Sequence, residues 1–214
     1  MKSKSLLFLF LLIHCFNSAQ TLKNVVVNLD GNGQIFDVKY ITSIQKYIVV
    51  GKFSSIQGHA VNNMALLDAN FNYVNATFPT VNNEIRCVET YLSTLYIGGM
   101  FTTVNGVAQQ GLARLSVTAP AVATDPYVIA HVPAFQLMNS CPTFYHVADM
   151  DLNGTEVVVA GGFYDGGRNG ILAYHVNTGA LNSKFGGDYG LQSYYDQYYP
   201  NPLFSVDKLN SNYE

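Results

Sequence analysis

Residues 95–116 read LYIGGMFTTVNGVAQQGLARLS, and residues 47–68 read YIVVGKFSSIQGHAVNNMALLD. Laid over each other without a gap, the two stretches share six identical positions: Gly51/Gly99, Phe53/Phe101, Gly58/Gly106, Ala60/Ala108, Ala65/Ala113 and Leu67/Leu115. A third and shorter copy, VVVAGGFYDGGRNGILAY, covers 157–174, where Gly161-Gly162-Phe163 matches the shared glycine and phenylalanine element and Gly162 and Phe163 are taken as its repeat positions. The chain is therefore built from a repeat, and its fold follows from one repeated unit.

Each copy of the repeat is preceded by an apolar segment that reads as a β-strand. These segments are 35–41, 85–91 and 144–150, and they align Val38, Val88 and Val147. A turn then leads to the strand that ends in Gly-x-Phe, to a polar loop, to a strand such as 64–67 and to a weaker strand near 73–78. Four short strands in roughly 50 residues, repeated, are typical of the blades of a β-propeller. We predict an all-β fold, a partial propeller with about three four-stranded blades and the start of a fourth.

The composition agrees with an all-β fold and excludes some partners. Only 12% of the residues are charged, whereas Tyr and Phe together number 28 and glycine 18. Aromatic and turn-forming residues in excess of Glu and Lys favour strands over helices. The net charge of −3 leaves no basic surface of the kind that binds nucleic acid, so we expect no nucleic-acid partner.

The second copy resembles the delta-sixty repeat family of β-propellers. The family motif is similar to "LYVGGxFTxxNG" followed by "xLARL", and here 95–106 read LYIGGMFTTVNG and 111–115 read GLARL. The first copy matches less closely and the third least, and the likeness covers roughly 35–185. The resemblance implies a propeller on exported, surface-exposed bacterial proteins of the Bacteroidetes type. It brings no general catalytic residues with it.

The N-terminal segment predicts export. Lys2 and Lys4 precede an unbroken apolar run at 6–13, and Ser18-Ala19 supply small residues for cleavage. This is the layout of a secretory signal peptide, and the run is too short for a membrane span. We therefore expect a secreted or outer-surface protein whose mature chain contains no transmembrane segment.

The repeat also divides the chain into expected units. The signal peptide takes 1–19, and 20–34 would be a strand of the blade that closes the ring, with 24–29 as its apolar core. The LFSVDKL segment that starts at Leu203 resembles the first strands of the other units. We predict three blades and the first strand of a truncated fourth, at 35–84, 85–143, 144–202 and 203–214. Three blades leave the ring open, so we expect further blades of a longer chain, or self-association, to close it.

Two cysteines remain after the signal peptide, Cys87 and Cys141. An exported chain meets oxidising conditions, which permits a disulfide between them. The alternative is two separate buried thiols, because free cysteine packs as a small hydrophobic residue. Neither lies in a CxxC pair of the kind that binds zinc.

The order of the residues shows no catalytic or metal-binding motif. Four histidines lie scattered at His59, His131, His146 and His175, and HExxH, GxSxG and P-loop patterns are absent. The segment 149–154, DMDLNG, starts like a calcium loop, but Ala160 occupies the twelfth place where an EF-hand needs Glu. We interpret it as a hairpin with Asn153-Gly154 as its turn. We predict no catalytic residues, no metal and no cofactor.

A tyrosine-rich segment is the strongest candidate for ligand contact. Residues 189–200 read YGLQSYYDQYYP, with Tyr189, Tyr194, Tyr195, Tyr198 and Tyr199. Exposed tyrosines stack on sugar rings or anchor a protein partner, whereas buried ones would only cover the core.

Two functions compete. The favoured one is a non-catalytic binding scaffold, with a protein or glycan ligand. The alternative is a secreted carbohydrate-active enzyme, a glycoside hydrolase or lyase. A glycosidase needs paired carboxylates, and the acidic residues here do not recur at matching sites of the repeats, as we align them.

Overall fold

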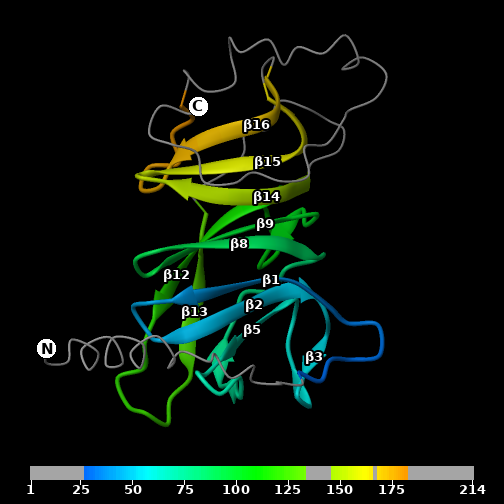
Figure 1. Ribbon diagram of the computed structural model, residues 1–214, viewed down its shortest axis with the longest axis vertical. Coiled ribbons are helices and arrows are strands. Elements are labelled where there is room, and N and C mark those ends of the chain that lie inside the picture. The colour runs from blue at the N-terminus through cyan, green and yellow to red at the C-terminus, as the bar shows by residue number, and fades with distance from the viewer. Residues whose placement is uncertain (1–26, 134–145, 166–167, 183–214) are drawn as a thin grey trace, which may run out of the picture.

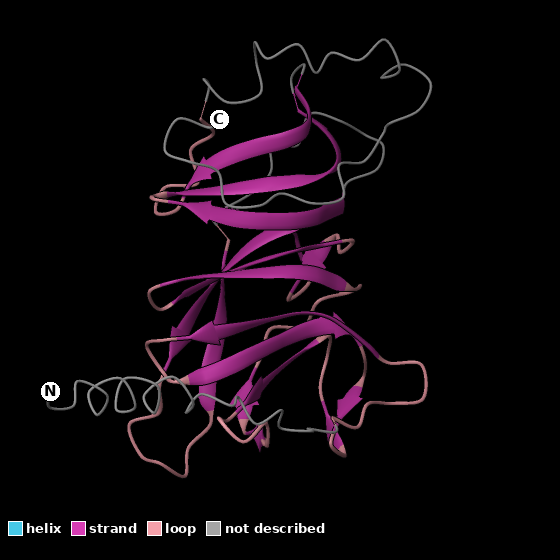
Figure 2. Ribbon diagram, viewed as in Figure 1, coloured by secondary structure: helices cyan, strands magenta, loops and turns pink. Residues whose placement is uncertain are grey.

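The computed structural model describes residues 27–133, 146–165 and 168–182. These residues form strands and turns and include no helix, which confirms the all-β prediction for this part of the chain. Nothing in it forms a helix of the length and apolarity needed to cross a membrane. The strands assemble into three main sheets stacked along the long axis of the molecule, together with two small hairpins (Figures 1 and 2).

Each main sheet is an antiparallel meander that begins at one edge with the first strand of its repeat. The first sheet runs in the order β1 (Gln34–Ile41), β2 (Lys46–Lys52), β5 (Met64–Leu67) and β6 (Tyr73–Val74). The second runs β8 (Ile85–Tyr91), β9 (Thr94–Gly99), β12 (Leu112–Thr118), β13 (Tyr127–Val132), with β7 (Ala76–Thr77) added parallel to β13. The third runs β14 (His146–Asn153), β15 (Glu156–Asp165) and β16 (Arg168–His175).

The two small hairpins follow the Gly-x-Phe element in the first two units. They are β3 (Ser55–Ile56) with β4 (His59–Ala60), and β10 (Thr103–Val104) with β11 (Val107–Ala108). In the third unit the corresponding hairpin is formed by the last residues of β15 and the first residues of β16, where Tyr164 lies opposite Asn169. The shorter loop of the third copy therefore merges the hairpin into the main sheet.

The strand register gives the true correspondence between the three units. Ile35, Ile85 and Val147 lie opposite Gly51, Gly99 and Gly161, and a β-bulge follows in each first strand. Our alignment of the third unit was therefore wrong in two places. Gly161, not Gly162, is the counterpart of Gly51 and Gly99, and Met150, not Val147, is the counterpart of Val38 and Val88. Phe163 keeps its place, two residues after the glycine.

The glycine at this position is required by the close approach of two backbones. A Cβ added to Gly51, Gly99 or Gly161 would lie 2.0, 2.3 or 2.1 Å from a carbonyl oxygen of the first strand, that of Gln34, Glu84 or His146. Real Cβ atoms do not approach backbone so closely, so no other residue fits without moving the bulge.

The hydrophobic core lies between successive sheets. The first sheet contributes Ile48, Val50, Met64 and Leu66 to one cluster, and the second contributes Ile85, Val88, Leu95, Ile97 and Phe101. The second and third sheets share another cluster, with Tyr96 and Leu112 against Val147, Met150, Val159, Leu172 and Tyr174. The first strands β1, β8 and β14 lie next to one another in that order (Figure 1). The units therefore stack side by side, and the second and third sheets each bury one face against the sheet before them.

Two boundaries differ from the predictions. The expected outer strand at 73–78 changes sheets at Asn75, so that β7 joins the second sheet. The third first strand continues to Asn153, and Gly154-Thr155 form the turn in place of Asn153-Gly154. Residues 24–26 of the expected closing strand lie outside the described residues. Leu29 forms a bridge with Ile56 of the first unit, so this segment contacts its own unit.

Leu92 is a point of backbone strain that can be relieved. It is the first residue of the two-residue turn between β8 and β9, where its φ is 56° and its exposure 76%. The matching turn of the third sheet uses Gly154, with φ 62°. A left-handed conformation costs a residue with a Cβ about 1–2 kcal/mol. Glycine avoids this cost, but it also increases the conformational entropy of the unfolded chain, which offsets part of the stabilisation. We expect Leu92→Gly to raise the free energy of unfolding by about 0.5–1 kcal/mol in urea titrations, and Ser93→Gly to lower it.

Candidate functional site

Charged residues recur at matching positions of the three first strands. Lys39, Glu89 and Asp151 lie opposite Ile48, Tyr96 and Val158, the same place in each sheet. Two residues earlier, Asp37, Cys87 and Asp149 are also equivalent. The expectation that acidic residues do not recur was therefore wrong, because Asp37 matches Asp149 and Glu89 matches Asp151. We name these six residues the inner charged row.

An ion pair links the first two sheets within this row. Lys39 Nζ lies 2.5 Å from Glu89 Oε1, and the Glu89 side chain is only 8% exposed, against 38% for Lys39. Burial raises the pKa of Glu89, and Lys39 offsets this only in part. Burial alone would lower the pKa of Lys39, but its hydrogen bond to Glu89 and that residue's charge raise it. The pair fixes the two strands, and it leaves Glu89 closed to any substrate.

Asp37 makes a second link across the same interface. Its Oδ1 accepts the N–H of Val38, and its Oδ2 accepts the N–H of Val88 at 2.9 Å. Cys87, the counterpart of Asp37 in the second sheet, has no carboxylate with which to accept the N–H of the next residue, Val88, as Asp37 accepts that of Val38. Burial raises the pKa of the Cys87 thiol well above its ordinary value, and Asp149, Asp37 and Glu89 act in the same direction. The thiol is therefore protonated at neutral pH.

The raised pKa of Glu89 sets the sign of a pH dependence. A carboxyl whose pKa is higher in the folded state than in the unfolded state binds its proton more tightly when folded. Its stabilising effect is full below the unfolded-state value, near 4.5, and is lost as the pH rises through the folded-state value. We expect the free energy of unfolding of the wild type, relative to Glu89→Gln, to fall from about pH 4 upward and then level off. Parallel pH profiles for the two variants would contradict this.

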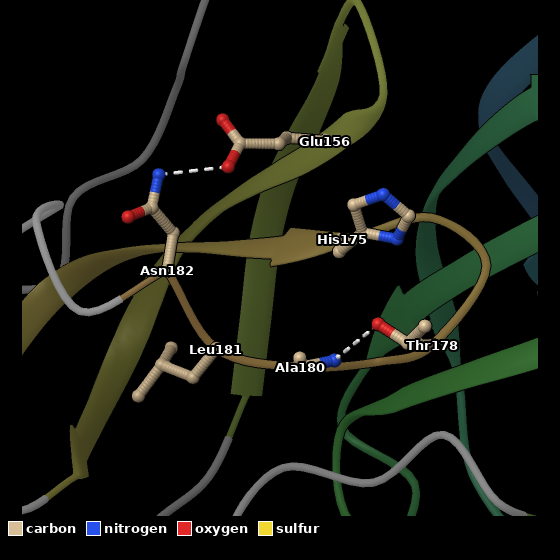
Figure 3. A pocket seen from close by; sticks show the side chains of 6 residues that line it. All are labelled: Glu156, His175, Thr178, Ala180, Leu181 and Asn182. Atoms are coloured by element: carbon tan, nitrogen blue, oxygen red, sulfur yellow. Dashed lines mark hydrogen bonds between the residues drawn. The ribbon is translucent and has the colours of Figure 1, made fainter.

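An open depression of about 440 Å³ lies where β16 ends (Figure 3). Glu156 and His175 are cross-strand partners in the sheet, and Thr178, Leu181 and Asn182 come from the turn that follows. Asn182 Nδ2 donates to Glu156 Oε1 at 2.7 Å, and the Ala180 N–H donates to Thr178 Oγ1. Among the described residues that line the depression there is one carboxylate, which is held by an amide, so these residues do not provide the two carboxylates of a glycosidase.

The structure gives a partial account of the predicted site residues. Tyr189, Tyr194, Tyr195, Tyr198 and Tyr199 lie outside the described residues, as does Cys141. Cys87 is buried, and its pairing with Cys141 stays a prediction. Among the described residues, no group of three or more His, Cys, Asp or Glu side chains could hold a metal ion. Asp149 and Asp151 lie in a strand that leads into a hairpin turn, as we interpreted the DMDLNG segment.

Sequence reasoning missed the inner charged row. A shift of three residues in the alignment of the third first strand hid it. The aspartate that begins both DVK at 37–39 and DMD at 149–151 was the signal that could have corrected the alignment. Comparisons with protein-family models and with curated proteins find no match for this chain. The delta-sixty resemblance therefore rests on the sequence motifs alone.

Proposed function

We propose that this protein is an exported β-propeller that serves as a binding scaffold, without catalysis of its own, at the cell surface or in the secreted fraction. The observation that carries the proposal is the common register of the three sheets, with β1, β8 and β14 adjacent and a buried apolar layer between successive sheets. Repeated antiparallel sheets that pack face to face support this proposal, because the blades of a propeller are such sheets. Rigid repeats of this kind present loops for recognition.

The chemistry of the described residues supports binding over catalysis. Glu89, the carboxyl with a raised pKa in the inner charged row, is buried and ion-paired with Lys39. A general acid must reach its substrate, and Glu89 is enclosed between two sheets. The alternative, a carbohydrate-active propeller enzyme, has less support for this reason.

The test uses the mature chain from Gln20 in native affinity gels that contain xylan, mannan or chitosan. Retardation by a polysaccharide, with no release of reducing sugars, is the expected result. Replacing Tyr194, Tyr195, Tyr198 and Tyr199 together by Ser should abolish the retardation. The matched control is Val107→Ser with Val128→Ser, two exposed apolar residues of the second unit. Release of reducing sugars by the pure protein would establish the enzyme alternative.

A further inference from the structure

The first strand of the first sheet exposes a row of large apolar side chains. Ile35, Phe36, Val38 and Tyr40 are 36%, 41%, 41% and 43% exposed. We call these four residues the β1 face. Scattered apolar residues on a surface are ordinary, but these four gather within six positions of one strand. Ile35, Val38 and Tyr40 lie on one face of the sheet, opposite Gly51, Val49 and Tyr47, and Phe36 lies at the bulge beside them.

The other two units show what covers this face. Ile85 and Val147 are the counterparts of Ile35, and both are fully buried. Val88 and Met150, the counterparts of Val38, are 0% and 3% exposed. In each case the sheet that comes before in the stack supplies the covering side chains. On this face of the first sheet the hairpin β3–β4 and Leu29 cover β2 and β5 through Ile56 and Phe53, but the described residues include no main sheet that covers β1.

We propose that the β1 face is the docking surface for a further four-stranded antiparallel sheet of the same repeat. The established interface between the first two sheets defines the chemistry of that partner. The partner presents an apolar face like that of Ile48, Val50, Met64 and Leu66, which covers Ile85 and Val88. The inference deepens the proposed function, on whose repeat it rests, by naming the partner of one surface.

Charge complementarity makes the partner more specific. Across the first interface Lys39 of the earlier sheet meets Glu89 of the later one, at the same register position. At the proposed interface Lys39 belongs to the later sheet. The partner therefore carries Asp or Glu at its own equivalent of position 39, because a lysine there would repel Lys39. A second copy of this chain has Lys39, Glu89 and Asp151 at these positions. The third sheet of such a copy has the required acid, Asp151, but the face that carries it is closed to docking, because Val158, Ala160 and Ala173 on that face are already buried.

The experiment adds a sheet and measures the protection of one residue. In an extended chain a copy of residues 29–80 is inserted before Leu29, which reproduces the natural junction between Thr80 and Val81. Val38→Cys in the original first sheet, in a Cys141→Ser background, reports by its rate of labelling with a maleimide. We expect labelling at least tenfold slower in the extended chain than in the parent. It should be slower still when the added copy carries Lys39→Glu.

Val107→Cys is the matched control, since Val107 is 44% exposed and lies on the hairpin of the second unit. Its labelling should be the same in the parent and extended chains. Equal labelling of Val38→Cys in both chains would overturn the proposal, and so would slowing at both positions. If Val38→Cys in the parent alone becomes protected as its concentration rises, the occupant is a second copy and the proposal is wrong.

A second measurement needs no added sheet. The fluorescence of a dye that binds exposed apolar surface should fall on Val38→Lys in the parent chain and not on Val107→Lys. Equal effects of the two substitutions would contradict a special role of the β1 face. These readouts are independent of polysaccharide retention, so failure of the docking surface and failure of the proposed scaffold function are distinguished.

Discussion

Replacement of Gly99 by alanine is expected to lower the free energy of unfolding by at least about 3 kcal/mol. The new Cβ would lie 2.3 Å from the carbonyl oxygen of Glu84 and 2.9 Å from the Cα of Ile85. Both atoms are backbone, so a change of rotamer cannot relieve the overlap. The bulge that pairs Ile85 with Gly99 must open, and Ile85 is fully buried at the interface with the first sheet.

Two other glycines separate this steric effect from the general cost of alanine. A Cβ on Gly106 meets nothing within 4 Å, but its φ is 73°, so Gly106→Ala should cost about 1 kcal/mol through strain alone. Gly31 has open space and no left-handed conformation, so Gly31→Ala should be close to neutral. The measurement is urea unfolding followed by circular dichroism, since the chain contains no tryptophan. A cost for Gly99→Ala no greater than that for Gly106→Ala would refute the close approach.

The second large effect is expected at Asn63. Its Oδ1 accepts the N–H of Phe53 at 3.1 Å, and its Nδ2 donates to the carbonyl of Asn83 at 3.0 Å. The residue is 9% exposed and its φ is 60°. Alanine would remove the side-chain hydrogen bonds and would be strained in the left-handed region. With about 1–2 kcal/mol for strain and a similar amount for buried groups left unpaired, we expect Asn63→Ala to cost about 3 kcal/mol.

The repeat itself provides the control for this prediction. Gly111 occupies the same place in the second sheet, with φ 63°, and its backbone bonds to Gly99 and Phe101 match those of Asn63 to Gly51 and Phe53. Asn63→Gly should therefore keep the backbone conformation and lose only the side-chain bonds, so it should be less destabilising than alanine by about 1 kcal/mol. If glycine is as harmful as alanine, the left-handed conformation is not what selects this residue.

Local signals in the sequence accounted for most of the architecture. The Gly-x-Phe element and the apolar segments before it located the first strands of the first two units within one residue. The third unit was misplaced because Gly162 was aligned with Gly51 and Gly99, although the Gly-x-Phe spacing, counted back from Phe163, points to Gly161. Register decides this: one residue of slip moves every side chain to the other face.

The inner charged row could not have been found from residue order. Lys39 and Glu89 are 50 positions apart, and only the packing of β1 against β8 brings their side chains together. The same holds for Asp37 and the N–H of Val88. The exposure of the β1 face also required the structure, because Ile35 and Val38 resemble their buried counterparts in sequence.

The sequence by itself determined the all-β class, the repeat and the need for glycine at Gly51 and Gly99, because strand periodicity and backbone crowding are local properties of the chain. The tertiary structure alone decided which residues meet across sheets. Those contacts depend on where each strand lies in three dimensions: Glu89 is buried against Lys39, whereas Val38, at the end of the stack, is left uncovered.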